Sequence, residues 1–322
     1  MTTRRGLAIG CGGLLGFAWT AVALDAVERA MNWDTRTADV LIGTSAGAEL
    51  VAALGSGRTP AAVLAALDAD PDADPILADH VAVDPGRIPP RPGLSLPALG
   101  LVGAGIRTGS PYTAMAGLLP CGRGDATWLR SYGRALAGAD EWVNHPATWM
   151  VAADAATGQR IALGATEGDE AAPATVGLGD AIAASWAIPG WFPPVRIGGK
   201  YYVDGGSVSS VSADLLMPLE LDEVVVIAPM TSEGGAPATG LNRVERLLRA
   251  QMTRGLDREV ALLRSAGTRV IRIEPGPAEL AAMGPNFMDS ARRPATLAAA
   301  RAVMATRVAE ALRADGSAGR RA

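Results

Sequence analysis

The chain has 322 residues, 49% of them hydrophobic and 19% charged, and this composition excludes an intrinsically disordered protein. Lys and Arg number 29 and Asp and Glu 33, which gives a net charge of −4, so we do not expect nucleic acid as a partner. Two cysteines and two histidines exclude a disulfide scaffold and a Cys-rich zinc module, and we expect neither a metal nor a cofactor.

The N-terminal residues 6–24 form an uncharged run that is long enough to cross a bilayer. A signal peptide cleaved after Ala21-Val22-Ala23 and a lipoprotein signal anchored at Cys11 are two interpretations. However, the run contains five glycines, and each would weaken a helix by about 1 kcal/mol relative to alanine. They favour a globular opening with a strand at 7–9, a glycine-rich turn and a helix at 17–30. If this run stays in the mature chain, we expect a cytoplasmic protein, with or without membrane association. Secretion is the alternative.

Strands and helices then alternate along the chain, as in an α/β protein. We predict strands at residues 38–42, 148–153, 159–163, 195–197, 201–203, 223–228 and 269–273, and helices at 46–54, 179–187, 241–266 and 291–313. Residues 58–122 differ, because an acidic stretch is followed by a Pro/Gly-rich run, and we expect an insertion or lid. The expected organisation is a catalytic core over 6–230, a helix–strand–helix extension of the same domain over 231–314, and a disordered tail over 315–322.

A G-x-S-x-G motif, Gly43-Thr44-Ser45-Ala46-Gly47, lies between a predicted strand and a predicted helix. A serine on such a tight turn is strained and exposes its hydroxyl, and the flanking glycines leave room for the turn. The helix N-terminus also favours negative charge nearby. In so glycine-rich a chain, roughly 0.2 such motifs would arise by chance. The position of the motif therefore predicts Ser45 as a nucleophile.

A second glycine-rich segment, residues 10–16, follows the first predicted strand. A dinucleotide fingerprint would require glycine where this chain has Leu15. An oxyanion hole built from the backbone N–H groups of Gly12 and Gly13 is another interpretation. Close packing of a strand against a helix, with no ligand, is the third.

A nucleophilic serine needs a base, and the chain offers two kinds. His80 and His145 would serve a Ser-His-Asp arrangement, although each lies in a segment typical of a surface loop. Asp204 ends an aromatic, β-branched strand and is followed by two glycines, which leave its carboxylate unhindered. An ordinary Asp-Gly turn is the alternative interpretation of that segment.

In this order, the glycine-rich turn, the Ser45 motif, the segment 184–195 (ASWAIPGWFPPV) and Asp204-Gly205-Gly206 resemble the patatin-like phospholipases over about residues 6–230. The resemblance implies a three-layer α/β/α fold with a central, mostly parallel sheet. It also implies a dyad without histidine, with Ser45 as nucleophile and Asp204 as general base. The implied oxyanion hole consists of the backbone N–H groups of Cys11, Gly12 and Gly13, with that of Ala46 as a further donor. The supporting motif glycines are Gly10, Gly43, Gly47, Gly205 and Gly206.

The activity implied is that of a lipid acyl hydrolase, of the phospholipase A or lipid esterase type, acting through an acyl-enzyme on Ser45. The expected partners are a lipid or other acyl-ester substrate and, transiently, a membrane surface. A Ser-His-Asp esterase and a non-catalytic lipid- or nucleotide-binding protein are the alternatives. Trp186, Trp191 and Phe192 fit either the wall of an acyl channel or the protein core.

Two departures from the family pattern are visible. Cys11 replaces the first glycine of the family's turn and Leu15 replaces its basic residue, which removes any electrostatic help from that side chain. After Asp204-Gly205-Gly206, residues 208–211 stand where the family has Asn-x-Pro.

We also expect the predicted helix at 241–266 to pack on the sheet with its arginines in solvent.

Overall fold

The structure is a computed structural model and describes residues 3–138, 141–165, 176–240 and 242–318. The described residues form an eight-stranded sheet with the order β5-β6-β3-β2-β1-β7-β8, and β4 pairs with β3. The pairings from β3 through β2, β1 and β7 to β8 are parallel, and those that involve β4, β5 and β6 are antiparallel. The strands are β1 (Arg5–Ile9), β2 (Val40–Thr44), β3 (Thr148–Asp154), β4 (Arg160–Leu163), β5 (Val195–Ile197), β6 (Lys200–Asp204), β7 (Glu223–Ile227) and β8 (Arg269–Ile273).

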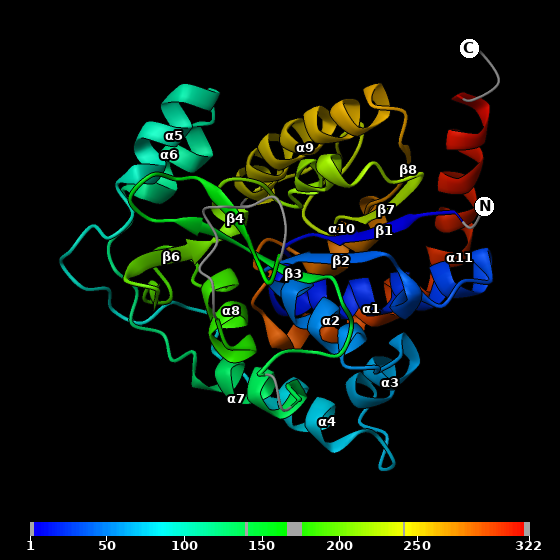
Figure 1. Ribbon diagram of the computed structural model, residues 1–322, viewed down its shortest axis with the longest axis horizontal. Helices are drawn as coiled ribbons and strands as arrows, with labels where there is room; N and C mark the ends of the chain where they lie inside the picture. The colour runs from blue at the N-terminus through cyan, green and yellow to red at the C-terminus, as the bar shows by residue number, and fades with distance from the viewer. Residues whose placement is uncertain (1–2, 139–140, 166–175, 241, 319–322) are drawn as a thin grey trace.

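Helices cover both faces of this sheet (Figure 1). The helices are α1 (Gly13–Met31), α2 (Ala46–Gly55), α3 (Pro60–Leu67), α4 (Pro75–Ala82), α5 (Gly100–Thr108), α6 (Pro111–Gly117), α7 (Thr127–Leu136), α8 (Leu178–Ser185), α9 (Asn242–Ser265), α10 (Pro277–Met283) and α11 (Arg293–Ala318). Because side chains alternate along a strand, Leu7 and Ile9 join the core under α1, α2 and α11, whereas Ala8 joins the core under α9. The predicted three-layer α/β/α architecture with a mostly parallel sheet is therefore confirmed.

The N-terminal run at 6–24 forms β1, the glycine-rich turn and most of α1, as the globular interpretation predicts. Strand β1 lies in the middle of the sheet, between β2 and β7, and the buried face of α1 packs against it. No helix in the described ranges is both long enough and apolar enough to cross a membrane.

Residues 58–122, predicted as an insertion, fold mainly into four helices, α3 to α6. Helices α3, α4 and α6 each begin with proline after a capping side chain, from Thr59, Asp74 and Ser110, which is a favourable start for a helix. α3 and α4 contribute to the core around α1. The α5–α6 pair packs separately, through Leu101 and Ala116, on the end of the sheet that carries β6.

The C-terminal elements extend the same sheet: β8 pairs with β7, and α9 and α11 pack on opposite faces. α11 continues to Ala318, into the segment that we predicted as a disordered tail. Residues 319–322 of that predicted tail lie outside the described residues.

Candidate active site

Strand β3 aligns the two candidate catalytic residues. Thr44, the residue before Ser45, is the register partner of Val151, and Asp204 is the partner of Ala152. Thr44 and Asp204 therefore lie beside consecutive residues of one strand, and this brings Ser45 close to Asp204 although 159 positions separate the two in the sequence. Both side chains are buried, with exposed fractions of 2% and 5%.

The turn at Ser45 is strained and held in place. Ser45 has φ +56° and ψ −118°, a region that residues with a side chain rarely occupy. Its backbone N–H donates to the hydroxyl of Ser185 at 2.8 Å, and that hydroxyl donates to the carbonyl of Val151 at 2.7 Å. Ser185, the last residue of α8, was not identified from the sequence as a site residue, although it belongs to the segment that carries the family resemblance. It links the strained turn to β3.

Close packing explains the motif glycines. A Cβ on Gly47 would lie 2.2 Å from the carbonyl oxygen of Ile9, so that α2 approaches the end of β1 only because residue 47 has no side chain. At the other motif positions a Cβ would likewise meet an atom of another residue at 3.0 Å or less, namely at Gly10, Gly43, Gly205 and Gly206.

Asp204 has the electrostatics of a base that works near neutral pH. Burial raises the pKa of its carboxyl group from 3.8 to about 7, and hydrogen bonding from the Gly206 N–H and the Ser45 hydroxyl opposes this rise. The Gly206 N–H donates to Oδ1 of Asp204 at 2.7 Å. A base with a pKa near the working pH combines a useful ionised fraction with a real affinity for a proton.

The glycine-rich turn supplies fewer oxyanion donors than we predicted. The N–H of Cys11 donates to the carbonyl of Ser210 at 2.8 Å and is not free for a ligand, so Cys11 as an oxyanion donor was wrong. Neither Gly12 nor Gly13 donates its N–H within the described structure, and both residues line the cavity that contains Ser45. Gly13 has φ +55°, which favours glycine. Gly12 and Gly13 therefore remain the candidate donors.

Both histidines have partners other than Ser45. Nε2 of His145 is 2.7 Å from the carbonyl of Ala38, which precedes β2, whereas Ser45 follows the other end of that strand. His80 is buried, bonds to Glu49 and stacks on Tyr132 with the ring centroids 3.6 Å apart. Neither histidine is among the described residues that line the cavity.

The cavity at Ser45 has a volume of about 660 Å³ and mainly apolar walls. Ser45, Asp204, Gly12 and Gly13 line it together with Tyr112, Met115, Leu119, Ile188, Met230, Val244, Leu247, Leu248, Met252 and Phe287. Trp186, Trp191 and Phe192 are absent from these walls; they are buried and pack on one another in the core. The core interpretation of these three aromatic residues is therefore confirmed.

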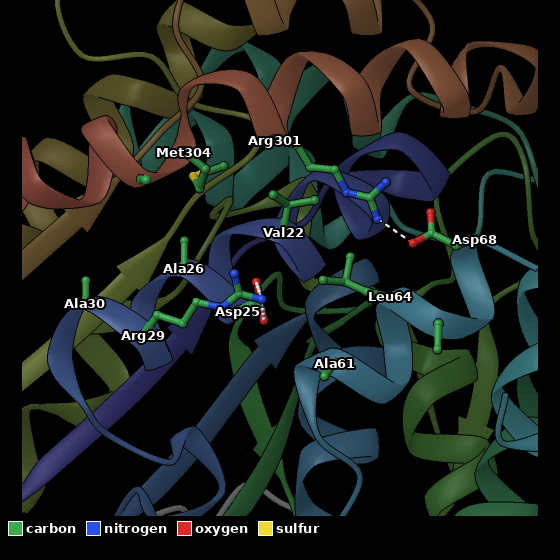
Figure 2. A pocket seen from close by; sticks show the side chains of 12 residues that line it. Val22, Asp25, Ala26, Arg29, Ala30, Ala61, Leu64, Asp68, Arg301 and Met304 are labelled. Atoms are coloured by element: carbon green, nitrogen blue, oxygen red, sulfur yellow. Dashed lines mark hydrogen bonds and ion pairs between the residues drawn. The ribbon is translucent and has the colours of Figure 1, made fainter. Parts of the chain in front are cut away.

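A second cavity, of about 720 Å³, lies between α1, α3 and α11 (Figure 2). Arg301 of α11 reaches Asp68 at 2.6 Å across it, and Arg29 pairs with Asp25 at 2.9 Å on α1. None of the candidate catalytic residues lines this cavity, and its charged groups already have partners. In the described part of the chain, no three His, Cys, Asp or Glu side chains are placed to hold a metal ion.

A comparison with protein families matched residues 7–217 to the patatin-like phospholipase model, which is more than half of the chain. The chain belongs to the patatin-like phospholipase family. Membership supports lipid acyl hydrolysis in general. Among solved structures, VipD from Legionella pneumophila is similar at a TM-score of 0.46 and 15% sequence identity, over 98% of this chain and 67% of that one. A comparison with curated proteins gave no match.

This patatin-like chain carries a buried cation beside its glycine-rich turn. Leu15, where the family has a basic residue, is fully buried in the core. Arg249 of α9 is 3% exposed and donates to the carbonyls of Pro229 and Thr231 at 2.6 and 3.2 Å. Arg249 also pairs with Glu245 at 2.7 Å. Burial and the charge of Asp204 raise the pKa of the Cys11 thiol, and the charge of Arg249 opposes this rise. The expectation that the arginines of this helix lie in solvent is wrong for Arg249.

Proposed function

We propose that this protein hydrolyses carboxylic ester bonds of lipids through a Ser45–Asp204 dyad and an acyl-enzyme intermediate. The observation that carries the proposal is the register of β3, which places a strained serine and a carboxyl group with a pKa of about 7 in one apolar cavity. The positions of His80 and His145 support an aspartate base instead of a histidine base.

In the first step, Oγ of Ser45 attacks the ester carbonyl carbon while the Asp204 carboxylate takes the hydroxyl proton. The carbonyl oxygen becomes an anion that the N–H groups of Gly12 and Gly13 stabilise, and the loss of one such donor typically costs about 3 kcal/mol. The N–H of Ala46, at the first position of α2, is a third candidate donor. Asp204 then returns the proton to the departing alcohol, which leaves the acyl group on Ser45.

In the second step, the Asp204 carboxylate accepts a proton from a water molecule as its oxygen attacks the acyl carbon. The bond between that carbon and Oγ of Ser45 then breaks, Asp204 returns the proton to Oγ, and the carboxylic acid leaves. The side chains of Met115, Leu119, Leu247, Leu248 and Phe287 offer a long acyl chain an apolar wall beside the serine. This lining supports a phospholipase A or a lipid esterase, as opposed to an enzyme for small polar esters.

The test is intact mass after treatment with a lipid-like fluorophosphonate, which forms a stable adduct with an activated serine. We expect one adduct on the wild type, none on Ser45→Ala, and slow labelling of Asp204→Asn. The double variant His80→Gln/His145→Gln, if folded by circular dichroism, should be labelled like the wild type.

Other results would overturn the proposal. Loss of labelling in a folded His145→Gln variant would assign a Ser-His-Asp esterase. No adduct on the wild type, combined with binding of a fluorescent lipid, would assign a non-catalytic lipid-binding protein.

A further inference from the structure

Exposed large apolar side chains are confined to a few elements of the fold. Among the described residues, the large apolar side chains that face solvent are Ile88, Leu94, Leu96, Leu99, Ile106, Met115, Leu118, Leu119, Tyr201, Val244, Leu247 and Leu262. They belong to residues 88–119, to β6 and to α9; none lies on α1 to α4, α7, α8, α10 or α11. Figure 1 shows α5 and α6 at the same side of the molecule as α9. Because scattered single exposures need no explanation, the concentration of these side chains on so few elements is informative.

Four of these residues surround the cavity that contains Ser45, and we call them the cavity rim. Met115 and Leu119, from α6 and the turn after it, are 68% and 43% exposed, and Val244 and Leu247 of α9 are 68% and 69% exposed. All four line the cavity as well as face solvent. Both sides of the cavity mouth therefore carry exposed apolar side chains, and on α9 these stand beside Gln251 and Arg254, which also line the cavity. The α9 side lies outside residues 7–217, which the family model matches.

The surface of α9 beside the rim carries uncompensated positive charge. The acidic residues of this helix are engaged: Glu245 with Arg249 at 2.7 Å, Asp257 with Arg272 at 2.6 Å, and Glu259 with Arg160 at 3.3 Å. In contrast, the exposed side chains of Arg243, Arg254 and Arg258 form no ion pair with any described residue. Exposed apolar side chains next to unpaired arginines are typical of surfaces that enter the interface of an anionic bilayer.

We infer that the cavity rim and the arginines of α9 dock this protein on an anionic lipid surface, with the apolar side chains in the acyl layer and the guanidinium groups on the lipid phosphates. The inference rests on the proposed function, because docking in this orientation opens the cavity toward the bilayer and lets an acyl chain reach Ser45 without crossing water.

Binding to vesicles tests the inference, with Ser45→Ala protein so that no lipid is consumed. Vesicles of equal parts phosphatidylcholine and phosphatidylglycerol should sediment the protein, and vesicles of phosphatidylcholine alone should sediment far less. In this background, Met115→Gln/Leu247→Gln should bind about tenfold more weakly, whereas Met115→Leu/Leu247→Met, which keeps the size and the apolar character, should bind like the parent.

The contribution of the arginines to vesicle binding is tested with a second pair of matched variants. Arg243→Gln/Arg258→Gln should weaken binding to the anionic vesicles, and a higher salt concentration should likewise weaken the binding of the parent to them. Arg29→Gln/Arg134→Gln removes as many exposed arginines from α1 and α7, on the opposite side of the sheet, and should leave binding unchanged.

The inference would be overturned if Met115→Gln/Leu247→Gln and Met115→Leu/Leu247→Met bound the anionic vesicles equally well. It would also be overturned if the parent did not bind these vesicles. Size-exclusion chromatography could instead show a dimer of the parent that becomes a monomer only in Met115→Gln/Leu247→Gln. That result would assign the cavity rim to contact with a second copy of the chain and would also overturn the inference. Fluorophosphonate labelling of the wild type separates the two proposals. Labelling without vesicle binding contradicts docking alone, and rim-dependent binding without labelling contradicts the hydrolase alone.

Discussion

The hydroxyl of Ser185 accepts the backbone N–H of Ser45 at 2.8 Å and donates to the carbonyl of Val151 at 2.7 Å. All three residues are buried, so that water cannot replace either bond. The turn that presents the candidate nucleophile is thus attached to the strand that aligns the candidate base. This connection makes Ser185 a positioning residue.

Replacement of Ser185 should slow the chemistry more than it weakens substrate binding. Ser185→Ala leaves a buried N–H and a buried carbonyl without partners, which should lower the free energy of unfolding by about 1–3 kcal/mol. Because the strained turn then relaxes, we expect kcat for a soluble ester to fall by about tenfold or more, with a small change in KM. Steady-state kinetics and thermal melting measure both effects.

Ser210→Ala is the matched control for Ser185→Ala, because Ser210 is buried and its hydroxyl has no partner in the described structure. Its kcat and melting temperature should stay close to those of the wild type. An equal loss of kcat in the two variants would contradict a specific role for Ser185.

The rate of acylation should depend on the ionisation of Asp204. The acid form dominates below pH 7 and cannot accept the serine proton, because the pKa of Asp204 is about 7. The value of kcat/KM for a soluble ester should therefore rise through about pH 7 and level off above it. A pH profile that is flat from about pH 5 to 9, or that keeps its inflection in Asp204→Asn, would refute this assignment.

The same shift predicts how Asp204 changes stability. Its pKa is higher in the folded chain, about 7, than the ordinary 3.8, so the folded state binds the proton more tightly and loses stability as the pH rises from about 4 to 7. At about pH 8 the penalty is at most about 4 kcal/mol. Asp204→Asn removes it and should melt at a higher temperature than the wild type at about pH 8, with little difference at about pH 4. A variant less stable than the wild type at both values would contradict the shift.

Two glycines in helices should respond oppositely to alanine. Gly47→Ala would place a Cβ 2.2 Å from the carbonyl oxygen of Ile9, so α2 must move away from β1, and both stability and serine labelling should be lost. Gly255, in α9, has no atom within 4 Å of its Cβ position, so Gly255→Ala should stabilise the protein by about 0.5–1 kcal/mol. Chemical denaturation of the two variants gives the comparison.

Local sequence pattern was enough to predict the elements that carry the candidate site. The apolar run at 7–9, the Ser45 turn and the Tyr201-Tyr202-Val203-Asp204 strand each encode their conformation in a few neighbouring residues, and the structure contains all three. The helices at 60–67, 75–82, 111–117 and 277–283 were missed as individual elements, because each is short, of seven or eight residues, and set among proline, glycine and acidic residues.

The sequence by itself determined the α/β class from short-range patterns. It also determined the candidate serine and aspartate, the aspartate through the order of motifs that resembles the family. Only the tertiary structure decided which groups meet. The carbonyl of Ser210 accepts the N–H of Cys11, Ser185 holds the Ser45 turn, and Arg249 is buried in an ion pair with Glu245. The first two contacts join segments that are distant in the chain, and their geometry depends on strand register and helix packing, which no local periodicity encodes.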